Sequence, residues 1–146
     1  MAHYALIGRN NKVIRVVKID NSIMGTPEKE ITGETYLSEI HGINCEWVQG
    51  SYNTKAGVHL LGGTPLRANF PSVGMIYDDD NDIFHEVRPK DKDGQSCTSW
   101  TLNTTTGVWS APITKPTSGV TETSWYVWDE SAYQSDNTKG WVKSDA

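Results

Sequence analysis

The chain has 146 residues, a formal net charge of -5, 21% charged residues and 36% hydrophobic residues. A chain of this length can bury roughly two thirds of its unfolded surface, so it is long enough to form a core. Six tryptophans, six tyrosines and two phenylalanines argue against disorder. The sequence contains no basic run, which argues against binding to nucleic acid or to an anionic membrane.

The first 53 residues predict a small α+β lobe. His3–Ile7 is expected to form a short strand, and Val13–Ile19, which is rich in β-branched residues, a second one. A Gly-Arg-Asn-Asn turn separates them, so we expect the two strands to pair as a hairpin. Cys45–Gln49 is expected to add a third strand after one short helix. The lobe is therefore predicted to run in the order hairpin, helix, strand.

Glu34–His41 is the best helix candidate in the chain. Tyr36, Leu37 and Ile40 are spaced to share one face, and the next residue, Gly42, suits the C-terminal end of a helix. The preceding residues 22–33 contain two glycines and a proline, so we expect them to form a loop.

Residues 54–73 are predicted to form an irregular arm or linker between this lobe and the rest of the chain. Gly57, Gly62, Gly63, Pro65 and Pro71 interrupt any long regular element. Exposed loops carry function more often than their share of residues. The arm is therefore also a candidate contact segment.

Residues 74–146 repeat an aromatic hairpin three times, which makes the predicted fold class mainly β. The pairs expected to form these hairpins are Gly74–Tyr77 with Ile83–Val87, Ser99–Asn103 with Val108–Ala111, and Trp125–Asp129 with Trp141–Lys143. Isolated hairpins are marginally stable in water, so the three must pack on one another, on the first lobe or on a partner.

The aromatic side chains of the last two hairpins are the residues we expect to contact a partner. They are Trp100, Trp109, Trp125, Tyr126, Trp128 and Trp141. Strand alternation places Trp125 and Val127 on one face and Tyr126 and Trp128 on the other, which favours packing on two sides. Two other interpretations remain open: cross-strand pairs that hold the hairpins together, and a sugar-stacking platform of Trp100, Trp109 and Trp128.

An acidic run, Asp78–Asp82, is the only metal candidate, and its ligands would be Asp78, Asp80 and Asp82. Calcium prefers several such oxygen ligands. However, Ile83 stands where an EF-hand loop needs glycine, and no glutamate follows at position 12. We therefore favour a hairpin turn and expect neither a metal nor a cofactor.

No constellation of catalytic residues is visible in the sequence. The four histidines lack metal-ligand spacing, and there is no G-x-S-x-G nucleophile motif. The N-terminus shows no signal peptide, so we expect synthesis in a cytoplasm with Cys45 and Cys97 reduced. These features predict a protein that is not an enzyme and does not enter a membrane.

Several segments, taken in order, resemble a family of small structural proteins of marine tailed phages, particularly cyanophages. The segments are an opening hairpin at 3–19, W-V-Q-x-S-Y-N at Trp47–Asn53, G-x-x-Y-D at Gly74–Asp78, W-x-L-N…W-x-x-P at Trp100–Pro112, and W-D-E…W-V at Trp128–Val142. The resemblance covers most of the chain and carries over no catalytic residue.

This resemblance implies a virion protein made in the host cytoplasm. The first expectation is a capsid decoration or cement protein that binds other virion proteins, above all the major capsid protein. A tail or tail-fibre component, an assembly chaperone and a carbohydrate-binding module for host adsorption are the alternatives. A homo-oligomer is also open, because structural proteins commonly form oligomers with closed symmetry.

Overall fold

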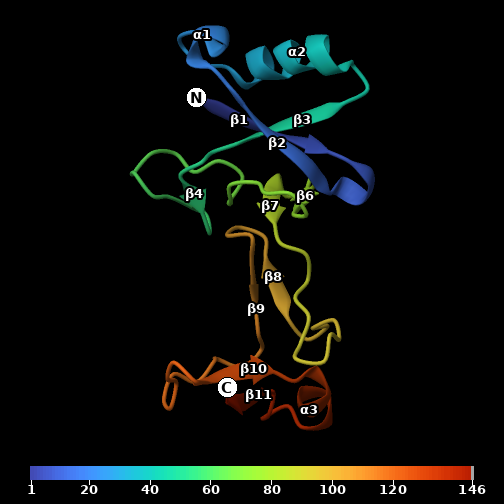
Figure 1. Cartoon of the computed structure of the whole chain (residues 1–146), viewed down its shortest axis with the longest axis vertical. Coiled ribbons are helices and arrows are strands. Elements are labelled where there is room, and N and C mark those ends of the chain that lie inside the picture. Colours follow the sequence, from blue (N-terminus) through green and yellow to red (C-terminus); the bar gives the residue numbers. More distant parts are fainter. Residues whose placement is uncertain (146) are drawn as a thin grey trace. The chain divides into compact units, whose positions relative to one another are not determined.

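The computed structural model describes residues 1–145, and the chain divides into two compact units (Figure 1). Unit 1 contains residues 1–87 and 104–108, and unit 2 contains residues 88–103 and 109 onward. Strands account for 32% of the chain and helices for 17%. The predicted mainly β class is confirmed.

Unit 1 is organised around a three-stranded antiparallel sheet with the order β2-β1-β3. The strands are β1 (Ala2–Ile7), β2 (Val13–Ile19) and β3 (Glu46–Gly50), and the turn η1 (Arg9–Asn11) joins the first two. Asn10 and Asn11 adopt positive φ in that turn, as the sequence suggested. The central strand is buried, with Tyr4 and Ala5 fully inaccessible.

Two helices cover one face of this sheet (Figure 1). They are α1 (Asn21–Met24) and α2 (Glu30–His41), and their buried side chains Met24 and Leu37 pack with Tyr4 and Trp47. The expectations of a single helix and of a loop over 22–33 were therefore wrong.

Local contacts explain the extra helical residues. The Asp20 carboxylate caps α1 by accepting a hydrogen bond from the Ser22 amide. Gly33 lies inside α2, because a Cβ there would come within 2.3 Å of the Tyr4 ring. Leu37 is buried as predicted, but Ile40 is 55% exposed and does not join the core.

A hairpin packs on the other face of the sheet. Its strands are β6 (Ile76–Asp78) and β7 (Ile83–His85), which pair with Tyr77 opposite Phe84. Phe84 and Tyr77 join Ala5 and Val48 in a second buried cluster. The predicted acidic hairpin is confirmed, and successive residues of β1 face opposite clusters because strand side chains alternate.

The 54–73 segment lies inside unit 1, not between the two units. It contains the short paired strands β4 (Thr54–Lys55) and β5 (Val58–His59). Thr54 is 2% exposed, and the Arg67 carbonyl accepts a hydrogen bond from the Phe84 amide. The segment is irregular, as expected, but it is packed against the hairpin.

Unit 2 contains the remaining aromatic strands and one helix. They are β8 (Thr101–Asn103), β9 (Val108–Ser110, whose first residue is assigned to unit 1), β10 (Ser124–Trp128), β11 (Trp141–Asp145) and α3 (Glu130–Ser135). The predicted pairings of β8 with β9 and of β10 with β11 are confirmed, and Trp128 lies opposite Trp141. The long loop expected between β10 and β11 instead includes α3, which Asp129 caps through the Ala132 amide.

Candidate interaction surface

Three of the predicted contact tryptophans pack against one another in unit 2. The ring centroids of Trp100 and Trp128 are 5.8 Å apart, those of Trp100 and Trp141 are 5.9 Å apart, and those of Trp128 and Trp141 are 5.1 Å apart. All three pairs meet edge to face, the arrangement that aromatic quadrupoles favour. Trp128 is only 4% exposed. This tryptophan cluster is the core of unit 2, so Trp128 cannot take part in an exposed sugar platform.

A buried carboxylate supports the tryptophan cluster. Glu130 is 3% exposed and accepts hydrogen bonds from Trp128 Nε1 at 2.7 Å and from Ser99 Oγ at 2.7 Å. The Ser99 amide, Thr98 Oγ1 and Gln134 Nε2 also donate to it. Burial alone would raise the pKa of Glu130, but these donors lower it to about 2. No feature of the sequence indicated that this glutamate is buried.

The other three predicted contact aromatics have separate environments. Arg88 lies over the Trp109 ring, with its guanidinium carbon 4.6 Å from the centroid. Trp125 is 37% exposed, whereas Tyr126 on the opposite face of β10 is half-buried. Trp125 is therefore the most accessible aromatic residue of the β10–β11 hairpin.

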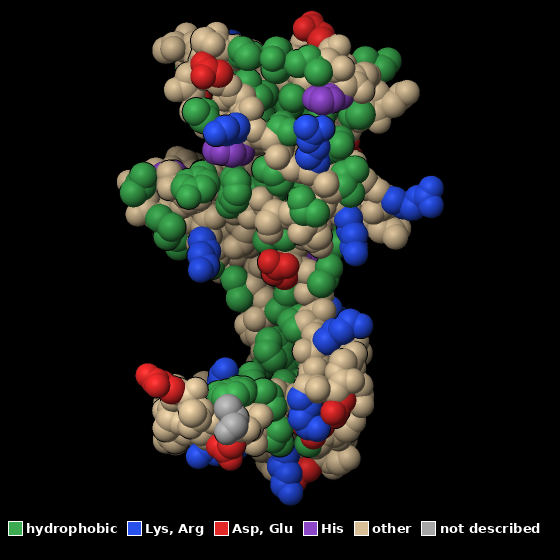
Figure 2. Space-filling model, in the orientation of Figure 1, with side chains coloured by type: hydrophobic (Ala, Val, Ile, Leu, Met, Phe, Trp, Pro, Cys, Tyr) green, Lys and Arg blue, Asp and Glu red, His purple; other side chains and the backbone are tan. Residues whose placement is uncertain are grey.

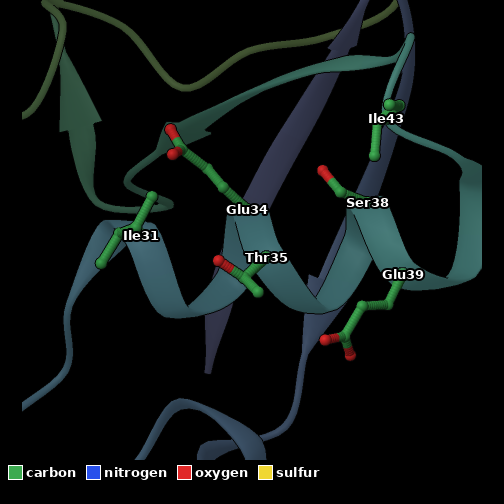
Figure 3. A pocket seen from close by; sticks show the side chains of 6 residues that line it. All are labelled: Ile31, Glu34, Thr35, Ser38, Glu39 and Ile43. Carbon is green, nitrogen blue, oxygen red and sulfur yellow. The ribbon is translucent and has the colours of Figure 1, made fainter.

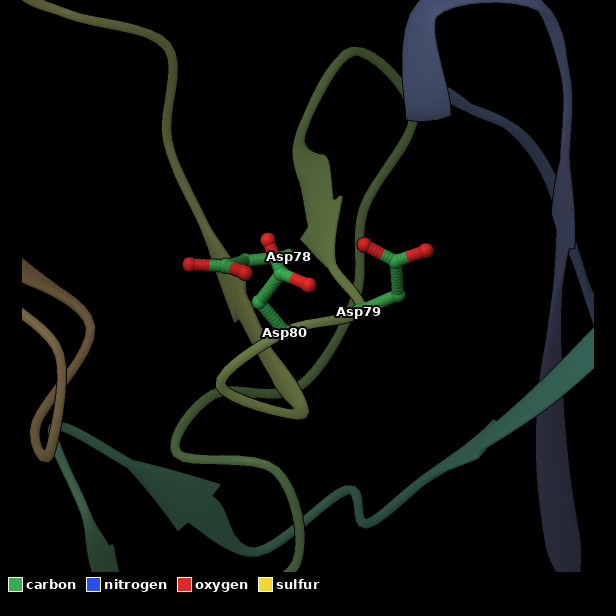
Figure 4. A group of neighbouring side chains, drawn as sticks. All are labelled: Asp78, Asp79 and Asp80. Atoms are coloured by element: carbon green, nitrogen blue, oxygen red, sulfur yellow. The ribbon is translucent and has the colours of Figure 1, made fainter.

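The acidic turn does not gather the three predicted ligands. Oxygens of Asp78, Asp79 and Asp80 lie within 4.8 Å of one another (Figure 4). Asp78 accepts hydrogen bonds from the Asn81 side chain at 2.8 Å and the Asn81 amide at 3.1 Å, and these bonds lower its pKa. Asp82, which was predicted to join them, instead contacts an arginine. The geometry is that of an Asx-type turn.

That arginine, Arg67, is the centre of an ionic network in unit 1. Its side chain is 13% exposed and lies 2.7 Å from Glu30 Oε1 and 2.7 Å from Asp82 Oδ1. It also donates to the Gln49 carbonyl at 3.0 Å, and the Tyr77 hydroxyl donates to Asp82 at 2.6 Å. The network fastens the 54–73 segment to α2, β3 and the acidic turn. Sequence reasoning did not identify it.

A cluster of exposed aliphatic side chains lies at the end of the β4–β5 hairpin. Val58, Leu60 and Leu61 are 58%, 64% and 77% exposed, and we call them the aliphatic tip. Figure 2 shows hydrophobic side chains gathered over this part of unit 1, beside β4. His59 Nδ1 accepts hydrogen bonds from the Leu61 and Gly63 amides, so the turn that carries the tip is held in shape.

A second apolar surface lies along α2. Ile31 and Ile43, which are 62% and 89% exposed, lie at opposite ends of a shallow hollow of about 340 Å³ (Figure 3). Glu34 and Glu39 line the same hollow and make it acidic. Burial, together with the charge of Glu30, raises the pKa of Glu34. This surface is more polar than the aliphatic tip.

Comparisons of the chain with protein families, curated proteins and solved structures gave no match. Within residues 1–145, no helix has the length and apolar character needed to cross a membrane.

Proposed function

We propose that this chain is a non-enzymatic structural protein of a phage particle and that it decorates the capsid by binding the major capsid protein. The aliphatic tip carries the proposal. Single exposed aliphatic residues are common on protein surfaces, but here three of them lie within the four residues from Val58 in β5 to Leu61 in the turn that follows. The phage-like order of sequence segments supports a partner within the virion.

The tip is suited to binding because its shape is already set. Burying one leucine side chain contributes about 1.5–3 kcal/mol, and ordering a flexible loop would consume much of that gain. Two hydrogen bonds from backbone amides to the His59 ring, together with the pairing of β4 with β5, order the loop before any partner binds. Most of the apolar contact energy then remains available for affinity.

Co-sedimentation with shells of the major capsid protein tests the proposal. The wild-type chain should pellet with the shells, and a Leu60→Ser/Leu61→Ser variant should bind at least roughly tenfold more weakly. Ile43→Ser is the control, because it removes an even more exposed aliphatic side chain next to α2, away from the aliphatic tip. Wild-type protein that stays in the supernatant, or a double variant that binds like the wild type, would contradict the proposal.

A further inference from the structure

The turn that carries the aliphatic tip is closed by a single ring nitrogen. His59 Nδ1 accepts hydrogen bonds from the Leu61 amide at 3.2 Å and from the Gly63 amide at 3.0 Å. A Cβ added to Gly63 would come within 3.1 Å of the same nitrogen, so the ring packs directly against this glycine. The positions of Leu60 and Leu61, two of the three residues of the tip, therefore depend on one histidine.

The two hydrogen bonds fix the protonation state of the His59 ring. A backbone amide can only donate, so Nδ1 must be the unprotonated nitrogen, and Nε2 must carry the single proton of the neutral imidazole. A second proton can therefore bind only at Nδ1, which is the atom that both amides contact. The imidazolium ion has no acceptor nitrogen, so neither hydrogen bond persists once the ring is charged.

We propose that His59 is a pH-sensitive switch of the aliphatic tip, in which protonation of Nδ1 releases the turn. The inference rests on the proposed function, because it assigns a regulation to the surface that binds the capsid in that proposal. At high pH the turn is ordered and the leucines are held in place. At low pH the Leu61 and Gly63 amides lose their common acceptor, and ordering the turn again consumes part of the binding free energy.

The surroundings of His59 leave the titration to the ring alone. Histidine is the side chain whose charge ordinarily changes between about pH 5 and 8, and residues 56–66 contain no other charged side chain. On β4, Thr54 lies opposite His59. The neighbouring Lys55 side chain points to the other face of the hairpin, because side chains alternate along a strand.

No acidic group compensates the charge of the protonated ring. The next charged residue along the chain, Arg67, is already paired with Glu30 and Asp82. No carboxylate of residues 1–145 lies within 4 Å of the His59 ring nitrogens. His59 is only partly buried, so the charged ring can turn toward water without unfolding unit 1.

Two-dimensional NMR of the full chain between pH 8 and pH 5 tests the switch without any partner. The Leu61 and Gly63 amide signals should shift with the same midpoint as the His59 ring signals, and both amides should lose hydrogen-exchange protection below that midpoint. The Leu60 amide donates to the Asn53 carbonyl, so it is an internal control and should keep its protection. The switch is wrong if the ring titrates while the Leu61 and Gly63 amides stay protected.

Three variants separate the ring from the rest of the turn. His59→Asn keeps a side-chain oxygen that accepts from a nearby backbone amide but does not titrate, so the pH response should disappear. His59→Phe has no acceptor, so both amides should be unprotected even at pH 8. His41→Asn replaces an exposed histidine elsewhere in unit 1 and should respond like the wild type. A pH response that persists in His59→Asn would overturn the inference.

Co-sedimentation with capsid shells at pH 8 and pH 5 tests the consequence for binding. Wild-type protein should bind at least about fivefold more weakly at pH 5, the change expected for the loss of one net hydrogen bond, whereas His59→Asn should bind equally at both. Equal wild-type binding at both pH values, or an equal loss in His59→Asn, would overturn the regulatory role and leave the capsid proposal intact. A turn that responds in the NMR spectra of a chain that never pellets with shells would contradict the capsid proposal and support the switch.

Discussion

Replacing Arg67 with alanine removes the centre of the ionic network in unit 1. Its guanidinium pairs with Glu30 and Asp82 at 2.7 Å each and donates to the Gln49 carbonyl. Breaking a buried ion pair by deleting one partner costs about 3–5 kcal/mol. The side chains of Glu30 and Asp82 are 33% and 58% exposed, so water can hydrate both after the change. We therefore expect the free energy of unfolding to fall by about 2–3 kcal/mol.

Urea unfolding followed by far-UV circular dichroism measures this loss, and hydrogen-exchange mass spectrometry locates it. The unfolding midpoint should fall without a change in the denaturant slope, because the folded surface stays the same. Amides of β1, β3 and α2 should exchange faster. Amides of the β10–β11 hairpin should keep their protection, because Glu30, Gln49 and Asp82, which accept from the Arg67 side chain, all belong to unit 1.

Two variants make the result specific to the network. Lys55→Ala removes an exposed cation from the same segment and should change stability by less than about 0.5 kcal/mol. Arg67→Lys keeps the charge but loses the planar fork, so it should lie between the wild type and Arg67→Ala. A loss below about 0.5 kcal/mol for Arg67→Ala, or equal loss of protection in both units, would refute the reasoning.

Three further variants test the packing of each unit. The pKa of Glu130 is lowered from 4.5 to about 2. Its ionised form therefore contributes no more than about 3 kcal/mol to the free energy of unfolding. This contribution is present above pH 4.5 and is lost as the pH falls toward 2. Glu130→Gln should flatten this acid dependence in tryptophan-monitored unfolding, and an unchanged slope would contradict the assignment. Gly33→Ala should lower the melting temperature, although alanine normally stabilises a helix, because its Cβ would overlap the Tyr4 ring. Trp128→Ala should cost about 3–5 kcal/mol in urea unfolding, whereas a cost near zero would mean that the tryptophan cluster is not the core of unit 2.

The hairpins were predictable because their signals are local. β1 and β2, for example, are short runs of alternating or β-branched residues joined by a turn that contains glycine and asparagine. The acidic turn between β6 and β7 likewise joins two short strands through residues that favour turns. Strand pairing over such short separations needs no information from the rest of the chain.

The helices of unit 1 were only partly predictable. Gly25, Pro27 and Gly33 are typical loop residues, yet α2 begins at Glu30 and includes Gly33. The sequence could not reveal that the Tyr4 ring occupies the space next to Gly33, because that contact joins a strand and a helix far apart in the chain. A tertiary contact therefore overrides the local propensity.

The polar networks and the burial of the aromatic residues could not be predicted from the sequence, because they also depend on contacts between residues far apart in the chain. Arg67 is 37 residues from Glu30, and Glu130 is 31 residues from Ser99. Strand alternation correctly separated the faces of β10, but it could not decide which face is buried. The packing of Trp128 with Trp100 and Trp141 decides that.

The central claim, our proposal that the chain is a phage capsid protein, is tested most directly by quantitative mass spectrometry of purified phage particles. The measurement compares the copy number of the chain with that of the major capsid protein in the same particles. A decoration protein should be present at a number close to that of the capsid subunits. A few copies per particle would move the chain to the tail, and its absence from purified particles would contradict a structural role in the virion.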